Sequence, residues 1–379
     1  MRILIPTADY PPIEGGIATL ALEVSRELVA LGHEVTVVAP WFPDMEAFDA
    51  AEATRVLRFS GYHWGWLRLL PMAWRTWPAL RNTDLVLAIN VSHGGLIAWA
   101  AKFLRGPPYV TFAYAYEFLK FAALPPARHL LLSIYRNALV TVAISQFTRR
   151  RLEDFGVPPE MITGIFPGGM PRACALPETT LPPDSPLCRD LGDAPFILSV
   201  GRFIPRKGQM TLVRAMPEIL EAHPDVHLVL AGRGPCLAEC QSEIRALGLK
   251  SRVHCPGYVE NETLAALYTA CALFALPTGE EEGGHVEGFG LVFVEAQAHG
   301  KATVAGRSGG VEDAVLDGET GLLVKPDDPG ETARAIVGLL SNPAEAKRLG
   351  NAGRQRVKDE LNWRVFTQRL LEAAGVEKP

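Results

Sequence analysis

The first forty residues carry the pattern that most restricts the fold. Residues 2–7 form a short apolar run, typical of a fully buried parallel strand, and residues 35–39 form a second one. Between them lie a loop that ends in Gly15 and Gly16, and a segment of helical periodicity that ends at Gly32. A strand, a glycine loop, a helix and another strand open a parallel α/β unit of the Rossmann-like kind.

A second series of strands begins after a proline-rich break. Six prolines lie within residues 171–195 and no periodicity survives there, so we expect an interdomain linker. A strand restarts at 196–200, and the chain again alternates strands with glycine loops and helices. We therefore predict two Rossmann-like domains, over residues 1–178 and 195–361.

The composition is that of a folded protein with two ordinary domains. Of 379 residues, 48% are hydrophobic and 21% charged, and the net charge of −5 gives no reason to expect nucleic acid as a partner. The six cysteines form no C-x-x-C pair, so we interpret them as free thiols in a reducing compartment. Met1 leads directly into a strand, and no apolar run is long enough to span a membrane. We expect a cytoplasmic location or the cytoplasmic face of a membrane.

Residues 276–310 hold two glutamates, Glu287 and Glu295, that are eight positions apart. Gly288 and Gly290 stand between them and allow the backbone to approach a ligand closely. If a helix begins near Gly290, Glu287 lies in the loop before it, and the exposed N–H groups of the first turn favour an anion.

The helix predicted from Gly290 would bury one face. Leu291, Val294 and Ala298 recur at helical spacing and face a core, which leaves Glu295 on the other side. The two carboxylates then lie at most roughly 12 Å apart along the helix axis. That separation suits one extended ligand better than one metal ion.

This segment resembles the E-x7-E motif of the family 4 retaining glycosyltransferases, which have the GT-B fold. In that family the second glutamate binds the ribose hydroxyls of a nucleotide sugar, and the first lies beside the transferred sugar. The resemblance assigns these roles to Glu295 and Glu287. The backbone of Gly288, Phe289, Gly290 and Leu291 would hold sugar hydroxyls and phosphate. A surface helix with two solvated glutamates is the alternative, but the glycines and the apolar face fit the motif.

A second match follows the strand at 196–200. The sequence there is G-R-F-I-P-R-K-G, and in the family the arginine and lysine of G-R-x4-K-G grip the donor diphosphate. The resemblance assigns Arg202 and Lys207 to this task. They supply positive charge beside the phosphates and would stabilise the departing diphosphate. A solvated basic turn is less favoured, because ligands bind at the carboxyl ends of strands in such folds.

Weaker matches complete the implied donor site. By resemblance, Gly15 and Gly16 approach the donor phosphate from the N-terminal domain, and the Gly232 loop adjoins the ribose and base. The base would meet backbone near Val259. The Gly15-Gly16 loop lacks the spacing of a dinucleotide fingerprint, which disfavours NAD. The last helix, about 362–379, is expected to pack back on the N-terminal domain.

The sequence departs from the family after the strand at 109–112. The family commonly carries H-G-x-[ED] there, with the histidine near the transferred sugar; aligned on Glu117, Tyr114 takes the place of that histidine. Tyrosine can donate a hydrogen bond to a sugar hydroxyl but cannot act as a base near neutral pH. His93, His285 and Glu117 are further candidates for contact with sugar or acceptor. A packed or surface histidine is the alternative for His93 and His285.

Residues 61–81 hold four of the seven tryptophans together with Arg68, Arg75 and Arg81. Such a mixture suits a membrane interface, where ring tips and cations meet head groups. We favour the alternative, an irregular helix pair broken at Pro71 and Pro78 that packs on the N-terminal core or lines the acceptor side. The reason is that apolar and basic residues do not separate cleanly onto two faces.

The resemblance covers nearly the whole chain and implies a retaining hexosyltransferase. The C-terminal domain would bind a nucleotide diphosphate sugar, with mannose or glucose as the hexose, and the N-terminal domain a lipid-linked, glycan or small-molecule acceptor. No Asp-x-Asp motif and no dedicated nucleophile appear, so we predict no metal or other cofactor and front-side attack. Alternatives are a nucleotide-sugar-binding protein without transferase activity, or a same-fold epimerase or phosphorylase. The tryptophans and arginines of residues 61–81 point to a lipid-linked or cell-envelope acceptor and leave peripheral membrane contact open. We expect a monomer or a dimer.

Overall fold

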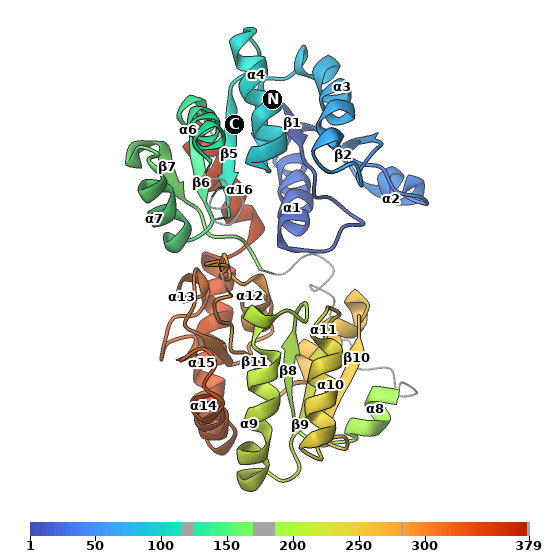
Figure 1. Cartoon of the computed structure of the whole chain (residues 1–379), viewed down its shortest axis with the longest axis vertical. Coiled ribbons are helices and arrows are strands. Elements are labelled where there is room, and N and C mark those ends of the chain that lie inside the picture. Colours follow the sequence, from blue (N-terminus) through green and yellow to red (C-terminus); the bar gives the residue numbers. More distant parts are fainter. Residues whose placement is uncertain (115–117, 119–123, 170–185, 282, 377–379) are drawn as a thin grey trace. The chain divides into compact units, whose positions relative to one another are not determined.

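Two separate parallel sheets organise the chain in a computed structural model (Figure 1). The structure describes residues 1–114, 118, 124–169, 186–281 and 283–376. The N-terminal unit comprises Met1–Pro167 and Trp363–Pro379, and the C-terminal unit comprises Gly168–Asn362.

The N-terminal unit is built on a seven-stranded sheet in the order β3-β2-β1-β4-β5-β6-β7. Its parallel strands are β1 (Arg2–Pro6), β2 (Glu34–Pro40), β3 (Arg55–Phe59), β4 (Leu85–Ala88), β5 (Tyr109–Ala113), β6 (Thr141–Ala143) and β7 (Ile162–Gly164). Its helices are α1 (Gly16–Ala30), α2 (Glu46–Ala51), η1 (Gly65–Arg68), α3 (Leu69–Leu80), η2 (Val91–Gly95), α4 (Leu96–Phe103), α6 (Pro125–Asn137), α7 (Gln146–Phe155), η3 (Pro159–Met161) and α16 (Trp363–Ala373).

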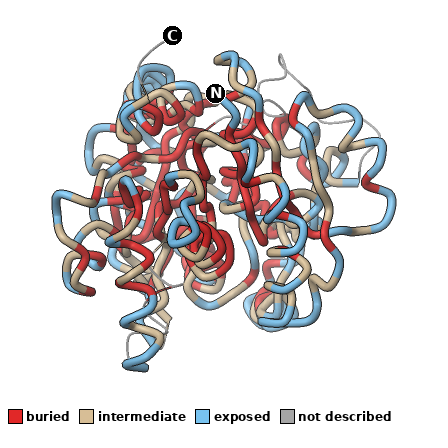
Figure 2. The backbone as a smooth tube through the Cα atoms, turned by 90° about the horizontal axis from the view of Figure 1, so that it is seen from above, coloured by how far each residue is buried: buried red, intermediate tan, exposed pale blue. Residues whose placement is uncertain are grey.

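Helices cover both faces of this sheet. Helix α1 packs against α16, whereas α4 packs against α3 and α6, and right-handed connections place these groups on opposite faces. Strands β4 and β5 are therefore buried along their whole length, which explains why they read as continuous apolar runs. Figure 2 shows the buried residues gathered along the strands and the inward faces of the helices.

The C-terminal unit has a six-stranded parallel sheet in the order β10-β9-β8-β11-β12-β13. Its strands are β8 (Phe196–Val200), β9 (His227–Ala231), β10 (Val253–Gly257), β11 (Leu273–Leu276), β12 (Thr303–Gly306) and β13 (Gly321–Val324). Its helices are α8 (Pro186–Leu191), η5 (Pro205–Lys207), α9 (Gln209–Ala222), α10 (Leu237–Ala246), α11 (Asn261–Ala270), α12 (Leu291–Ala298), α13 (Val311–Ala314), α14 (Pro329–Ser341) and α15 (Pro343–Asp359).

The structure corrects several details of the sequence prediction. Residues 186–191, inside the predicted linker, form α8, while 170–185 lie outside the described residues. Helix α3 is not broken at Pro71 or Pro78. Pro71 lies in the first turn, where a missing N–H costs no helical hydrogen bond, and Pro78 lies in the last turn.

Candidate active site

The carboxyl ends of β8 and β11 define the candidate site in the C-terminal unit. These strands are neighbours, and the order of the strands in the sheet reverses between them. Open α/β sheets bind ligands at such a reversal. The loop after β8 carries Arg202 and Lys207, and the loop after β11 leads to Glu287. The fold therefore brings the two strongest sequence motifs to one edge of the sheet.

Lys207 and Glu287 form an ion pair at this edge. Lys207 Nζ lies 2.6 Å from Glu287 Oε2, and the side chains are only 12% and 15% exposed. Burial by itself raises the pKa of the Glu287 carboxyl. The charge and hydrogen bond of Lys207, with Arg206 and Arg202 nearby, outweigh burial and hold that pKa below its ordinary value. The carboxylate is therefore ionised at neutral pH.

Backbone contacts lock the β8 loop onto the β11 loop. Gly208 has a φ of 69°, and a Cβ there would lie 2.1 Å from the carbonyl oxygen of Pro277. The N–H of Gly279 donates to the carbonyl of Arg206 at 2.8 Å, and the N–H of Arg206 donates to Glu281 Oε1 at 3.3 Å. Only glycine fits the conformation and the space at position 208, and its close approach sets Lys207 beside Glu287.

Two further loops hold the backbone around Glu287. The N–H of Gly310 donates to the carbonyl of Glu287 at 2.8 Å, and a Cβ on Gly309 would lie 2.3 Å from that oxygen. Gly290, with φ 93°, caps α12, and a Cβ there would lie 2.6 Å from the ring of Phe293. The N–H groups of the first turn of α12 therefore begin directly after the Glu287 loop, where an anion is favoured.

Helix α12 starts where the sequence predicts, but its buried face is broader than expected. Val294 and Ala298 are buried, whereas Leu291 is half-buried and shares the more open side with Glu295. The prediction that Leu291 faces the core opposite Glu295 is wrong. The remaining sides are covered because α12 also packs against α15 and β12.

Tyr268 contacts the second glutamate of the motif. Its hydroxyl donates to Glu295 Oε2 at 2.9 Å. Burial raises the pKa of Glu295, and the hydrogen bond from Tyr268 and the charge of Lys207 lower it without cancelling the effect of burial. Sequence reasoning missed Tyr268, because it lies on α11, 27 positions before Glu295, with no motif around it.

The remaining predicted donor residues lie at the ends of β8, β9 and β10. A Cβ on Gly232 would lie 2.0 Å from the carbonyl oxygen of Gly201, so only glycine fits there. Val259 is half-buried next to Tyr258, and the guanidinium carbon of Arg233 lies 5.3 Å from the Tyr258 ring centroid. Arg202 is exposed, and among the described residues its guanidinium has no hydrogen bond or ion pair.

His285 lies in a tight turn of the β11 loop. Its carbonyl accepts a hydrogen bond from the N–H of Glu281 at 3.0 Å, and its Nδ1 lies 3.7 Å from Glu281 Oε2. Gly283 and Gly284, both with positive φ, make the turn. His285 thus lies beside Glu281, and its contact with sugar or acceptor stays a prediction.

His93 is packed in the N-terminal unit. The Arg68 Nε donates to His93 Nε2 at 3.0 Å, Ser92 Oγ lies 3.0 Å from Nδ1, and the Trp66 ring stacks on the imidazole with centroids 5.4 Å apart. Arginine can only donate, so Nε2 carries no proton and the ring is neutral. His93 is thus buried among these partners, and its contact with sugar or acceptor stays a prediction.

The other candidates of the N-terminal unit lie at strand ends. Gly15, with φ 144°, caps α1, and both it and Gly16 are exposed. Tyr114 follows β5 and is half-buried. Glu117 lies outside the described residues. The predicted contacts of these residues with donor or acceptor stay predictions.

Sequence reasoning also missed a polar cluster where the N-terminal sheet reverses, between β1 and β4. Asn90 Nδ2 donates to Asp9 Oδ2 at 2.8 Å, and Asn90 Oδ1 accepts from Thr7 Oγ1 at 2.9 Å and from the N–H of Ala8 at 2.7 Å. Asp9 is thus fixed at the edge where such sheets bind ligands. The sequence did carry one sign of this cluster, because polar residues come directly after the two buried strands β1 and β4.

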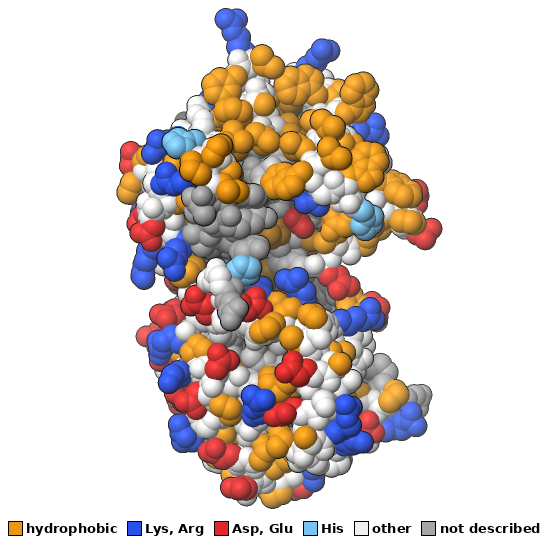
Figure 3. Space-filling model, viewed as in Figure 1, with side chains coloured by type: hydrophobic (Ala, Val, Ile, Leu, Met, Phe, Trp, Pro, Cys, Tyr) orange, Lys and Arg blue, Asp and Glu red, His pale blue; other side chains and the backbone are white. Residues whose placement is uncertain are grey.

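The face of α3 that points away from the sheet is apolar and exposed. Met72, Thr76 and Leu80 are buried, whereas Trp74 is 81% and Leu70 is 69% exposed. Figure 3 shows hydrophobic side chains spread over this part of the N-terminal unit, with Lys and Arg side chains at its border. The prediction that residues 61–81 pack on the core is therefore correct for one face of α3 only.

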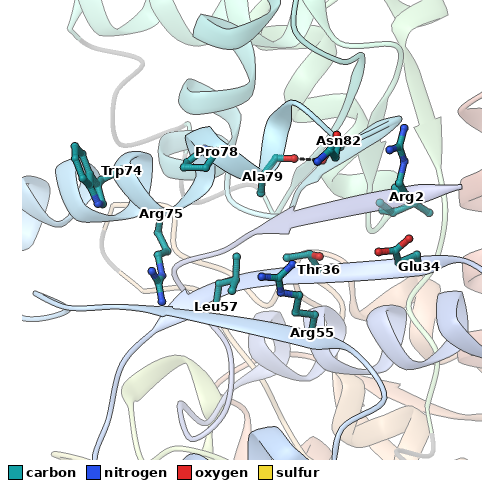
Figure 4. Close-up of a pocket in the computed structure, with 12 residues that line it drawn as sticks. Arg2, Glu34, Thr36, Arg55, Leu57, Trp74, Arg75, Pro78, Ala79 and Asn82 are labelled. Atoms are coloured by element: carbon teal, nitrogen blue, oxygen red, sulfur yellow. Dashed lines mark hydrogen bonds between the residues drawn. The ribbon is translucent and has the colours of Figure 1, made fainter.

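A cavity of about 360 Å³ lies beside α3 at the opposite edge of the sheet, where β1, β2 and β3 begin (Figure 4). Arg55, Arg75 and Trp74 are among its lining residues. The arginines outnumber the lining Glu34, so the cavity is basic, and within this unit it lies at the opposite strand ends from Tyr114, which follows β5.

Two general features bear on partners. Among the described residues, no helix combines the length and apolar character that crossing a bilayer requires. The same described residues contain no group of three or more His, Cys, Asp or Glu side chains that could hold a metal ion. Among the described residues, Cys236, Cys240, Cys255 and Cys271 carry free thiols.

Comparison with known proteins agrees with this architecture. The family model described as Glycosyltransferase Family 4 matches residues 14–168, and the model described as Glycosyl transferases group 1 matches residues 190–356. Anabaena Alr3699/HepE in complex with UDP and glucose superposes with a TM-score of 0.79 at 22% identity, over 100% of both chains. Sucrose-phosphate synthase from Thermosynechococcus elongatus superposes with a TM-score of 0.77 at 24% identity, over 98% of this chain and 97% of the other.

Two curated relatives align over nearly the whole length. The GDP-mannose-dependent alpha-(1-6)-phosphatidylinositol monomannoside mannosyltransferase of Mycolicibacterium smegmatis is 33% identical over 380 residues, 98% of this chain and 97% of the relative. The protein of the same name from Mycobacterium tuberculosis is 30% identical over 382 residues, with 98% and 97% covered.

Two parallel α/β units, with a paired cation and acid at the reversal of the C-terminal sheet, define a glycosyltransferase of the GT-B fold. The full-length relatives narrow the assignment further. The chain belongs to glycosyltransferase family 4.

Proposed function

We propose that the protein transfers a mannosyl residue from GDP-mannose to a lipid-linked mannoside, with retention at the anomeric carbon and without a metal. Donor and acceptor follow the names of the relatives that align over 98% of the chain. The Lys207–Glu287 pair supports the proposal, because a cation suited to phosphate and a carboxylate suited to hydroxyls lie side by side at the reversal of the C-terminal sheet.

The donor roles follow from the chemistry of each group. Arg202 and Lys207 face the diphosphate, together with the first N–H groups of α12. Glu287 accepts hydrogen bonds from sugar hydroxyls, for which an ionised carboxylate is suited. Glu295 accepts hydrogen bonds from the ribose, and the Gly232 loop and Val259 border the base.

The transfer needs no nucleophile from the protein. The bond between C1 of the sugar and the diphosphate oxygen breaks, and the acceptor oxygen bonds to C1 on the same face. The acceptor's proton passes to the leaving phosphate oxygen. Negative charge grows on that phosphate, so Arg202, Lys207 and the N-terminus of α12 lower the barrier by stabilising it.

Turnover measured with purified protein tests the proposal. With a phosphatidylinositol mannoside as acceptor, GDP-mannose is expected to yield GDP and an α-linked product, equally well in EDTA, while UDP-glucose yields none. Equal activity of a folded Glu287→Ala variant would contradict the site. Conversion of donor without acceptor would indicate an epimerase, and nucleotide binding without turnover a binding protein.

We further propose that the N-terminal unit contacts the cytoplasmic face of a membrane. The lipid acceptors named for the relatives and the exposed outer face of α3 support this contact. Indole rings and leucines insert among head groups, while Arg75 and Arg55, which line the same cavity as Trp74, attract anionic lipid (Figure 4).

Vesicle flotation tests the membrane contact. We expect binding to vesicles that contain phosphatidylinositol, weaker binding to phosphatidylcholine alone, and loss of binding in a Leu70→Ser, Trp74→Ser variant. The control is Leu247→Ser, which removes a leucine that is 41% exposed in the C-terminal unit. If both variants bind vesicles like the wild type, α3 is not the contact.

A further inference from the structure

Tyr268 connects two helices at the second glutamate of the E-x7-E motif. The residue is fully buried on α11, and its hydroxyl reaches Glu295 Oε2 on α12 at 2.9 Å. Its ring stacks on that of His299, one turn beyond Glu295, with centroids 5.5 Å apart and planes inclined by 16°. The ring centroid of Phe274 lies 5.8 Å away on another side. The phenol thus has little freedom to turn.

The imidazole behind Tyr268 is itself held in one orientation. Thr269 Oγ1 donates to the carbonyl of Ala265 at 2.9 Å, and it lies 3.1 Å from His299 Nδ1. Since the threonine proton is already used, Nδ1 must be the donor to Oγ1. His299 is neutral in this arrangement, because burial lowers its pKa, as do Lys301 and Arg354 nearby. The chain of contacts therefore runs from Thr269 through His299 to Tyr268.

We propose that Tyr268 is a positioning residue for nucleotide binding: its hydrogen bond holds one oxygen of Glu295 and so turns the other toward the ribose. The inference rests on the proposed function, in which Glu295 accepts hydrogen bonds from the ribose hydroxyls. A carboxylate has two oxygens, and the phenol engages one of them, so the other is presented to the ribose.

The electrostatic part of this role follows from burial. A partly buried carboxyl protonates more readily than an exposed one, and a protonated carboxyl is a weaker acceptor for ribose hydroxyls. Burial raises the pKa of Glu295, and the Tyr268 hydroxyl opposes that rise. Without the hydroxyl, Glu295 would take up a proton at a higher pH, and the nucleotide would bind less well at neutral pH.

Calorimetry with Tyr268→Phe tests the proposal, since this change keeps the ring and removes only the hydroxyl. We expect GDP to bind about tenfold more weakly than to the wild type at pH 7, with the deficit shrinking as the pH rises toward 9. The same variant should bind 2′,3′-dideoxy-GDP as the wild type does, because that nucleotide lacks both ribose hydroxyls.

Tyr109→Phe is the matched control. It removes a buried tyrosine hydroxyl that donates to the carbonyl of Ile134 in the N-terminal unit, far from Glu295 in the sequence. Both variants are compared with the wild type by melting temperature, which identifies a loss of folded protein. The control is expected to leave GDP binding and its pH profile unchanged.

Three outcomes would overturn the inference. Tyr268→Phe with a pH profile parallel to that of the wild type would mean that the hydroxyl does not govern the ionisation of Glu295. An equal loss of GDP and dideoxy-GDP would mean that Tyr268 only packs. If the wild type itself does not distinguish the two nucleotides, and Glu295→Gln binds GDP normally, the ribose assignment in the proposed function is wrong as well.

Discussion

Lys207 Nζ lies 2.6 Å from Glu287 Oε2, so the cation expected at the diphosphate and the acid expected at the sugar are ion-paired partners. The two residues are 80 positions apart in the sequence, and the reversal between β8 and β11 brings them together. Under the proposed function, donor binding shares Lys207 between Glu287 and a phosphate. A diphosphate competes well for such a cation, because it carries more negative charge than one carboxylate.

Removing the Lys207 ammonium should reverse the way in which the ionisation of Glu287 affects the stability of the fold. The pKa of Glu287 is lowered in the folded protein, so its contribution to stability is present above its ordinary pKa and is lost as the pH falls through the folded value. In Lys207→Met the two largest effects that oppose burial are lost and only Arg206 and Arg202 still oppose it, so we expect the pKa of Glu287 to rise. We expect the variant to lose about 1–3 kcal/mol of unfolding free energy at pH 7 and less at pH 5, measured by urea denaturation.

The control for that experiment is Arg214→Gln. Arg214 pairs with Glu243 at 2.7 Å, a similar distance, but its side chain is 52% exposed. Water screens this pair, so its loss should change the unfolding free energy by less than about 1 kcal/mol. Equal losses for the two variants would contradict a special role of burial at Glu287.

Arg202 should act on the phosphates rather than on the nucleoside. Its guanidinium is exposed at the end of β8, close enough to lower the pKa of Glu287. Replacement by glutamine is expected to weaken GDP binding at least about tenfold while guanosine binding stays unchanged, as measured by calorimetry. Arg214→Gln again serves as the control. A loss of the same size for guanosine would place Arg202 at the base.

Much of the fold could be predicted from local pattern. Buried parallel strands such as β8 and β11 read as short apolar runs, and glycine loops mark their carboxyl ends, so the two α/β units follow. Strand β3 and helix α15 were not predicted. β3 lies at the edge of its sheet, contains two arginines among its five residues and is only partly buried. α15 is mostly polar. Neither has the apolar pattern that marks a central element.

The candidate site was predictable in its motifs but not in its pairings. Arg202, Lys207 and Glu287 could be named because their spacing resembles a family pattern. The Lys207–Glu287 pair and the Tyr268–Glu295 hydrogen bond depend on the packing of loops and helices distant in sequence. Such contacts leave no periodicity. The same holds for Asp9 and Asn90, which meet only because β1 and β4 are neighbours.

Gly208 should be indispensable for the pairing of the two loops. Alanine at this position would suffer from its φ of 69° and would also place a Cβ 2.1 Å from the carbonyl oxygen of Pro277. Gly248 has a nearly identical φ of 70° and no atom within 4 Å of its Cβ position, so it isolates the cost of the backbone conformation. We expect Gly248→Ala to cost about 1 kcal/mol of unfolding free energy and Gly208→Ala clearly more.

The functional effect of these two glycine variants should differ as well. Gly208→Ala pushes the β8 loop away from the β11 loop, which separates Lys207 from Glu287, so GDP affinity should fall. Gly248→Ala lies after α10 and should bind GDP like the wild type. Equal GDP affinity of the two folded variants would show that the close approach at Gly208 does not set the site.

A pair of histidines at the other edge of the C-terminal sheet should make stability depend on pH. Arg252 Nη1 donates to His227 Nε2 at 2.9 Å, so the proton of His227 is on Nδ1, which donates to His254 Nε2 at 2.7 Å. Asp190 on α8 lies 3.9 Å from His254 Nδ1, and Asp225 pairs with Arg252 at 3.8 Å. Protonation of either ring would break this chain of hydrogen bonds.

Both histidines have a lowered pKa, chiefly through burial; His254 and Arg252 lower that of His227 further, whereas Asp190 acts in the opposite sense on both. The unfolded chain then binds more protons than the folded one below about pH 6.5, so stability should be lost as the pH falls from 7 toward 5. Each unit of lowering corresponds to about 1.4 kcal/mol. In His254→Gln the slope of unfolding free energy against pH should be shallower, while His223→Gln, which alters a histidine bonded to Ser341, should keep the wild-type slope. Parallel slopes in all three proteins would assign the acid sensitivity to other groups.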